Sequence, residues 1–161
     1  MYNNFGKFID GKWQQSEKKE TYDVINPATE EVIGSASKAS SIEVQKALKS
    51  AEKGLKVWSN TTPWQRSYVL RKIADLMREK KDVLAKWLTL EVGKPLTEGV
   101  GEVGGAADIF EWNAEETKRI YGQTVESRFP ETRVHVYYQP VGVVAALIPW
   151  NFPIVLASRK I

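Results

Sequence analysis

Residues 141–148 form an uninterrupted apolar run, Val-Gly-Val-Val-Ala-Ala-Leu-Ile, and this run most constrains the fold. A strand with one face in water alternates apolar and polar residues, so a continuous run is typical of a strand covered on both faces in an α/β sheet. The run leads into Pro-Trp-Asn-Phe-Pro at residues 149–153. Asn151 is therefore a single polar amide, held between two prolines and two aromatic residues at the end of an expected buried strand.

Four segments before this run carry apolar residues at helical spacing. Two of them begin with a capping box, in which a hydroxyl and a Glu or Gln three residues later bond to the first free backbone amides. Ser40 with Glu43 and Thr62 with Gln65 fit this pattern. The expected helices lie near residues 40–58, 62–77, 82–91 and 97–120.

Short strands are expected before the first helix and after the fourth. Asp10-Gly11 suits a tight hairpin turn between residues 7–10 and 12–14. Apolar and polar side chains alternate over residues 133–139, which predicts a strand with one face in water. The other expected elements are strands over 22–25 and 31–36, a turn at 26–29, and a helix that begins within 154–161.

Composition excludes several kinds of site. The 161 residues contain no cysteine and one histidine, His135, so we expect no disulfide, no thiolate metal site and no metal-binding residues. The net charge is only +3, and the basic residues are spread along the chain, which argues against nucleic-acid binding. Because there is no basic and apolar leader and no apolar stretch of 18 residues, we expect a cytoplasmic protein without a membrane segment.

Residues 99–104, Gly-Val-Gly-Glu-Val-Gly, match the dinucleotide fingerprint G-x-G-x-x-G. That fingerprint requires a preceding strand and a following helix, so that the helix N-terminus faces a pyrophosphate. Residues 93–98 do not resemble a strand, and the glycines lie within a helical pattern. We favour close packing against a neighbouring backbone over dinucleotide binding as the reason for these glycines.

Local chemistry leaves two interpretations of Asn151 open. A neutral amide keeps its two N–H donors at every pH and could stabilise an oxyanion that develops during a reaction. An asparagine in a turn also commonly bonds to its own backbone. The residues around Asn151 do not by themselves decide between these interpretations.

Residues 139–153 resemble the strand and turn that open the cofactor-binding sheet of NAD(P)-dependent aldehyde dehydrogenases. The Pro-Trp-Asn-Phe-Pro element is highly specific, whereas Asn-Pro-Ala-Thr at 26–29 would be weak evidence alone. The chain is similar to the N-terminal portion of this family only. Further matching stretches follow the family's order at residues 8–13, 26–29, 91–96, 101–103 and 119–122.

The resemblance implies an α/β fold class, as an incomplete N-terminal part of the aldehyde dehydrogenase fold. This part would comprise short N-terminal strands, four helices, one oligomerisation strand and the first strand of a Rossmann-like parallel sheet. Residues 1–132 and 140–161 would belong to the NAD(P)-binding domain, and 133–139 to the oligomerisation sheet. The catalytic domain would be absent.

The resemblance also implies roles for individual residues. In the family, a cysteine thiolate attacks the aldehyde, hydride passes to NAD or NADP, and the acid is released. Asn151 matches the oxyanion donor, and Ile148, Pro149, Trp150 and Asn151 match positions that line the cofactor site. No residue here matches the family's cysteine, its general-base glutamate or its cofactor-ribose lysine, so we expect the 161 residues alone to be inactive.

Further expectations concern assembly and the remaining residues. We expect the full-length protein to take an aldehyde and a nicotinamide cofactor and to form a homo-oligomer, a dimer or tetramer. A truncated, non-catalytic module that pairs with other subunits through residues 133–139 is the alternative, and the isolated chain is expected to self-associate. Two sets of residues are given no catalytic or binding role: Glu91, Glu98 and Glu102 as solvated or capping acids, and Trp58, Trp64 and Trp87 as core residues.

Overall fold

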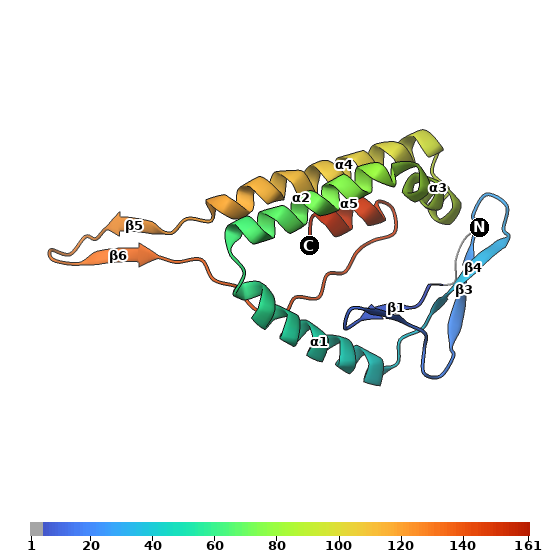
Figure 1. The fold of residues 1–161 in the computed structure, drawn as a ribbon, viewed down its shortest axis with the longest axis horizontal. Helices are drawn as coiled ribbons and strands as arrows, with labels where there is room; N and C mark the ends of the chain where they lie inside the picture. The colour runs from blue at the N-terminus through green and yellow to red at the C-terminus, as the bar shows by residue number, and fades with distance from the viewer. Residues whose placement is uncertain (1–4) are drawn as a thin grey trace.

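A computed structural model, which describes residues 5–161, shows a group of packed helices with β-hairpins at its two ends (Figure 1). Helices α2 (Pro63–Glu79) and α4 (Leu96–Glu116) lie side by side, and α3 (Lys81–Val92) packs against α4. The short helix α5 (Pro153–Ser158) also lies on α4. Helix α4 is therefore the common support of the other three.

The buried residues of α4 form the core of this group. Ala107 and Phe110 pack with Ala74 of α2, while Val103 packs with Ala85 and Leu88 of α3. The small alanine side chains let the helix backbones approach closely, and burying one large apolar side chain contributes about 1.5–3 kcal/mol. The helix group is held mainly by this apolar contact.

Ion pairs add to the contact between α2 and α4 at its surface. Arg71 pairs with Glu111 at 3.0 Å and with Glu115, and Arg78 pairs with Asp108 at 2.8 Å. All these side chains are substantially exposed, and exposed pairs contribute about 0–1 kcal/mol each. Their contribution is thus secondary to that of the apolar core.

Both capping boxes are confirmed. Ser40 precedes helix α1 (Ser41–Ser59), and its hydroxyl accepts the Glu43 amide at 3.3 Å while the Glu43 carboxylate accepts the Ser40 amide at 2.7 Å. Thr62 and Gln65 make the same reciprocal bonds at the start of α2. The helix starts follow from a few neighbouring residues, so the sequence pattern was sufficient to locate them.

The N-terminal hairpins are also confirmed. Strand β1 (Lys7–Ile9) pairs antiparallel with β2 (Lys12–Gln14) across Asp10 and Gly11, whose φ angles of 55° and 74° suit a tight hairpin turn. Strand β3 (Thr21–Ile25) pairs with β4 (Val32–Ser37), and the Ala28 amide donates to the Asn26 side chain within the connecting turn. These hairpins lie at the end of the molecule opposite the third one (Figure 1).

The prediction of a strand over residues 141–148 is wrong for this structure. These residues form neither helix nor strand, and Val141 and Leu147 are 94% and 85% exposed. A strand needs a neighbour that accepts and donates its backbone hydrogen bonds. No strand lies beside this segment among residues 5–161, so the apolar run has the sequence of a buried strand without the partners that would make it one.

The strand expected over residues 133–139 is shorter than predicted and has a partner that the sequence did not reveal. Strand β6 (Arg133–Val136) ends three residues early and pairs with β5 (Gln123–Glu126), with Thr124 opposite His135. The two strands form a hairpin that extends away from the helices (Figure 1). Every residue of both strands is exposed.

Of the three tryptophans expected in the core, two are exposed and the third, Trp87, is half-buried. Trp58 and Trp64 are 42% and 70% exposed. Trp87 of α3 does pack, edge to face against Phe5 with ring centroids 5.5 Å apart. Helical spacing identifies a shared face but not what covers it.

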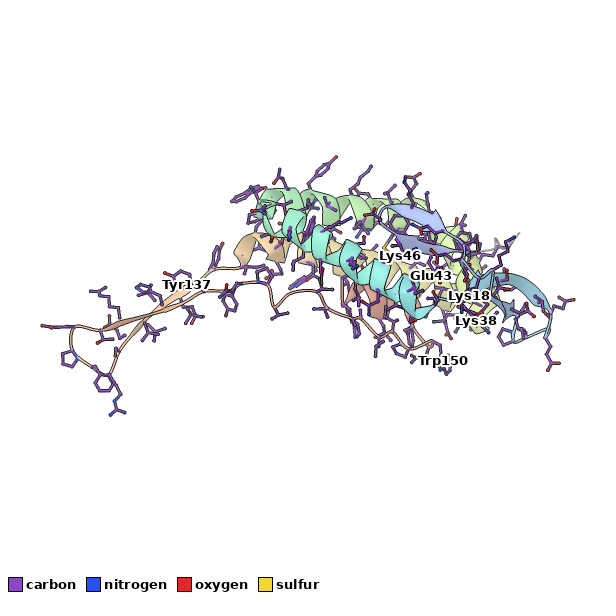
Figure 2. All side chains as sticks on the ribbon, turned by 90° about the horizontal axis from the view of Figure 1, so that it is seen from below. Lys18, Lys38, Glu43, Lys46, Tyr137 and Trp150 are labelled. Carbon is purple, nitrogen blue, oxygen red and sulfur yellow. The ribbon has the colours of Figure 1, made fainter. Side chains whose placement is uncertain are left out.

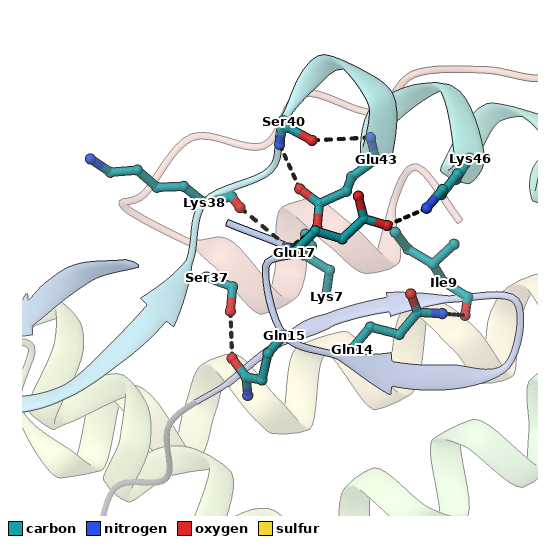
Figure 3. A network of polar contacts seen from close by, with 10 residues as sticks. All are labelled: Lys7, Ile9, Gln14, Gln15, Glu17, Ser37, Lys38, Ser40, Glu43 and Lys46. Carbon is teal, nitrogen blue, oxygen red and sulfur yellow. Dashed lines mark hydrogen bonds and ion pairs between the residues drawn. The ribbon is translucent and has the colours of Figure 1, made fainter. Parts of the chain in front are cut away.

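Glu43 connects α1 to the N-terminal hairpin (Figure 3). Its buried carboxylate pairs with Lys7 at 2.8 Å and accepts the Glu17 amide at 3.1 Å, in addition to the cap at Ser40. These contacts lower the pKa of Glu43 from 4.5 to about 2. The hydrogen bond from Lys7 is the largest cause, and the bond from the Ser40 amide is the next. The ionised carboxylate therefore favours the folded state.

Replacing this carboxylate should make the stability of the chain less dependent on pH below 4.5. Because the folded pKa is depressed, the stabilisation is present above pH 4.5 and is lost as the pH falls towards about 2. We expect Glu43→Gln to lower the melting temperature at pH 7, and the gap to wild type to narrow between pH 4.5 and 2. Glu52→Gln, an exposed change on the same helix, is the control; an equal gap at pH 7 and pH 2.5 would contradict this prediction.

Candidate functional site

Residues 149–153 form the turn that leads into α5. Pro153 occupies the first turn of α5, where a missing backbone N–H leaves nothing unsatisfied. The residue before it, Phe152, provides no side-chain cap. The free amides at the start of α5 must therefore be satisfied from elsewhere in the chain.

Glu102 of α4 supplies that cap. One oxygen of its carboxylate accepts the Ile154 amide at 2.9 Å and the Val155 amide at 3.3 Å. The Glu102 side chain is completely buried, so these bonds are not exchanged with water. A carboxylate at a helix N-terminus also interacts favourably with the helix dipole. The position of α5 on α4 thus depends on Glu102.

Lys94 holds the turn itself. Its buried ammonium pairs with the second oxygen of Glu102, donates to the backbone carbonyl of Asn151 at 3.0 Å, and lies 4.2 Å from the ring centre of Phe152. Lys94 reaches this place because α3 ends at Gly93, whose φ of 78° turns the chain sharply. One cation therefore contacts the acid that caps α5 and two residues of the turn.

The Asn151 side chain is not used by its own turn. Its backbone carbonyl accepts the bond from Lys94, whereas its amide has no hydrogen-bond partner within the part of the chain that the structure describes. Asn151 is exposed and borders a hollow of about 620 Å³ with Phe152, Gly101 and Arg159. The two N–H donors of the amide are available to a molecule in this hollow.

The other residues expected to line a cofactor site lie along the coil before Asn151. Ile148 is 39% exposed and Trp150 is 79% exposed, and Pro149 is exposed between them. Figure 2 shows the Trp150 side chain projecting away from the ribbon. None of these three borders the hollow beside Asn151, and their assignment to a cofactor stays a prediction.

Sequence reasoning missed Lys94, Glu102 and Arg159. The sequence predicts Glu102 to be a solvated or capping acid; it does cap a helix, but one distant in the sequence, and it is buried. The contact between Lys94 and Asn151 spans 57 residues. No local pattern signals such a contact, although a lysine after a helix-ending glycine and a glutamate eight residues later could have suggested a pair.

The glycines of the G-x-G-x-x-G match lie within α4, and the element directly before α4 is helix α3 rather than a strand. A Cβ atom at Gly99 would lie 2.9 Å from the Ala85 carbonyl oxygen, so the packing interpretation is confirmed for this residue. Gly101 and Gly104 have no such neighbour within 4 Å. The helix around these glycines has the wrong preceding element for a dinucleotide fingerprint.

Among residues 5–161, no cluster of three or more His, Cys, Asp or Glu residues is arranged to hold a metal ion. None of the helices described is both long and apolar enough to cross a membrane.

The sequence matches the aldehyde dehydrogenase family over residues 13–161. The chain belongs to this family. Among its curated relatives, glutarate-semialdehyde dehydrogenase of Pseudomonas aeruginosa is 44% identical over 153 residues, which are 95% of this chain and 32% of the relative. The NADP-dependent succinate-semialdehyde dehydrogenase of Escherichia coli is 43% identical, over 94% of this chain and 32% of the relative.

Solved structures agree with this assignment. An NADP-dependent enzyme of Escherichia coli has a TM-score of 0.93 and 41% identity, over 98% of this chain and 33% of that one. Succinate-semialdehyde dehydrogenase of Burkholderia pseudomallei has a TM-score of 0.91 and 38% identity, over 99% of this chain and 33% of that one. The chain therefore has the fold of the N-terminal part of aldehyde dehydrogenases and spans about a third of their length.

Two alanine substitutions in α4 should have opposite effects on stability. Gly99→Ala places a methyl group against the Ala85 backbone and should cost about 1–3 kcal/mol. Gly104→Ala meets no atom and removes a flexible residue from a helix interior, so it should stabilise the chain by up to about 1 kcal/mol. Urea unfolding of both variants checks this, and a change of the same sign in both would contradict it.

Proposed function

We propose that this chain is the N-terminal part of an NAD(P)-dependent aldehyde dehydrogenase that oxidises an aldehyde to a carboxylic acid, with Asn151 as the oxyanion donor. The observation that carries the proposal is the unused Asn151 amide, which borders a hollow while a buried lysine holds its backbone. Membership of the family supports the reaction type. The chain contains no cysteine, so the attacking thiolate must come from elsewhere in the full-length protein.

The role of Asn151 follows from charge. When a nucleophile adds to an aldehyde, the carbonyl oxygen becomes an alkoxide, and a donor already in place stabilises this charge more than it stabilises the neutral substrate. A primary amide suits the task because it neither titrates nor gives up its proton. The bond from Lys94 to the Asn151 carbonyl leaves the side chain free to point at that oxygen.

NAD or NADP, when bound, supplies the acceptor for the hydride. Ile148, Pro149 and Trp150 would contact it, since all three lie exposed immediately before Asn151 and the Trp150 ring is open on the surface. A structure of betaine aldehyde dehydrogenase from Staphylococcus aureus in complex with NAD⁺ has a TM-score of 0.88 and 34% identity to this chain, which supports the same cofactor class.

We further propose that the substrate is a semialdehyde that carries a carboxylate. The relatives named above act on glutarate and succinate semialdehyde. Arg159 borders the same hollow as Asn151, and a guanidinium binds a carboxylate through two parallel hydrogen bonds. Two acids, Glu98 and Glu102, also border the hollow. The negative charge of Glu102 is neutralised by Lys94. Asn151 and Arg159 would thus bind the two ends of one substrate.

We assign residues 1–132 and 140–161 to the cofactor-binding domain and 133–139 to an oligomerisation sheet. The hairpin of β5 and β6 supports the second assignment, because it extends from the helices with every residue of its strands exposed (Figure 1). A β-hairpin with an open edge is suited to pair with another strand. We propose a homo-oligomer, dimer or tetramer, in which this hairpin pairs between subunits.

Removing the Asn151 amide should slow the reaction in the full-length protein. Loss of one oxyanion donor typically costs about 100- to 1,000-fold in kcat, and we expect Asn151→Ala to fall in this range with little change in KM for NAD(P). Initial rates of NAD(P)H formation measure both. Asn60→Ala, which removes an amide at the C-terminus of α1, is the control. An unchanged kcat in Asn151→Ala would refute the assigned role.

Removing the Arg159 guanidinium should affect only substrates with a carboxylate. Loss of a hydrogen bond to a charged group costs about 1.5–3 kcal/mol, so KM for succinate semialdehyde should rise about 10- to 100-fold in Arg159→Ala. Butanal, which has the same chain length without the carboxylate, is the matched substrate and should show little change. Equal losses for both substrates would contradict the proposed contact.

A further inference from the structure

We infer that the buried pair of Lys94 and Glu102 positions Asn151, and that both are positioning residues for the reaction, which act through the turn that carries Asn151. This inference rests on the proposed function of Asn151. It adds two residues, from the loop after α3 and from α4, to a site that the family resemblance placed only in residues 148–151.

The first step is that the pair is buried. The Lys94 and Glu102 side chains are 8% and 0% exposed, and they contact each other directly. A buried charge that loses its partner is strongly unfavourable, whereas a complete pair is tolerated. Each residue therefore fixes where the other can lie, and neither can turn out into solvent at low cost.

The second step is that the remaining bonds of both residues go to the turn and to α5. Lys94 donates to the Asn151 carbonyl at 3.0 Å, and its ammonium lies over the Phe152 ring at 4.2 Å. Glu102 accepts the Ile154 and Val155 amides. The two charges thus hold the chain on both sides of Pro153, and Asn151 lies within four residues of every one of these contacts.

The third step is that little else fixes Asn151 among residues 5–161. The preceding residues 141–148 form no strand, and the Asn151 side chain has no partner of its own. The direction of its amide is then set by the backbone at residue 151, where Lys94 binds. Displacement of a reacting group by about 1 Å can cost about 100-fold in rate, so this restraint matters for catalysis.

A double variant separates positioning from folding. Lys94→Met with Glu102→Gln removes both charges together, so no unpaired buried charge remains, and the glutamine can still accept one of the amide bonds of α5. In the full-length protein we expect kcat to fall about 10- to 100-fold with KM for NAD(P) and aldehyde changed less than threefold. The single variant Lys94→Arg keeps the positive charge and a hydrogen-bond donor, so its kcat should lie between that of the double variant and that of wild type.

Arg71→Met is the matched control. It removes a cation that pairs with two acids of α4 but does not contact the turn. We expect it to lower the melting temperature while kcat stays within about twofold of wild type, the result of a merely structural ion pair. If the double variant behaved in the same way, with lower stability and unchanged kcat, the inference would be overturned.

Hydrogen exchange tests the same inference without activity. In Glu102→Ala the amides of Ile154 and Val155 lose their acceptor and should exchange about tenfold faster, as expected for a lost helix cap. Amides in the middle of α2 should keep their wild-type rates. Unchanged exchange at residues 154 and 155 in Glu102→Ala would refute the positioning role. If exchange in this variant were faster but the wild-type full-length protein oxidised no aldehyde, only the proposed function would be refuted.

Discussion

The buried contact between Lys94 and Glu102 is the interaction on which the arrangement of the site depends. It joins the loop after α3 to α4 and, through the further bonds of both residues, to the turn and α5. Such a pair is stable only when both partners are present and correctly placed, because each buried charge is costly alone. The position of the turn that carries Asn151 is therefore determined by α4.

Helix α4 can serve as this support because its own place is fixed by packing. Gly99 lets α3 approach so closely that a methyl group would meet the Ala85 carbonyl, and this approach brings the end of α3, and with it Lys94, beside Glu102. On the other side, Ala107 and Phe110 pack against α2. Small residues at the helix contacts thus determine where a charged residue meets the turn.

The sequence predicted those features that depend on neighbouring residues. The caps at Ser40 and Thr62 and the turn at Asp10 and Gly11 are each specified within four residues, and each formed as expected. Residues 141–148 show the opposite case. Their apolar pattern is that of a buried strand, but a strand also requires a partner, and residues 5–161 provide none beside it.

The candidate site divides in the same way. Asn151 could be identified because two prolines and a specific family motif surround it within five residues. Lys94 and Glu102 could not, because their contacts with residues 151, 154 and 155 span more than 50 residues and leave no periodic or local signal. Arg159 likewise gained a role only when the fold placed it at the same hollow as Asn151.

The most direct test of this account is a crystal structure of the Lys94→Met, Glu102→Gln variant, superposed on wild type through α2 and α4. The account predicts that these two helices coincide while residues 149–153 shift or lose a single defined position. If residues 149–153 and the Asn151 amide occupied the wild-type position in the variant, the pair would not hold the turn, and the central claim would be contradicted.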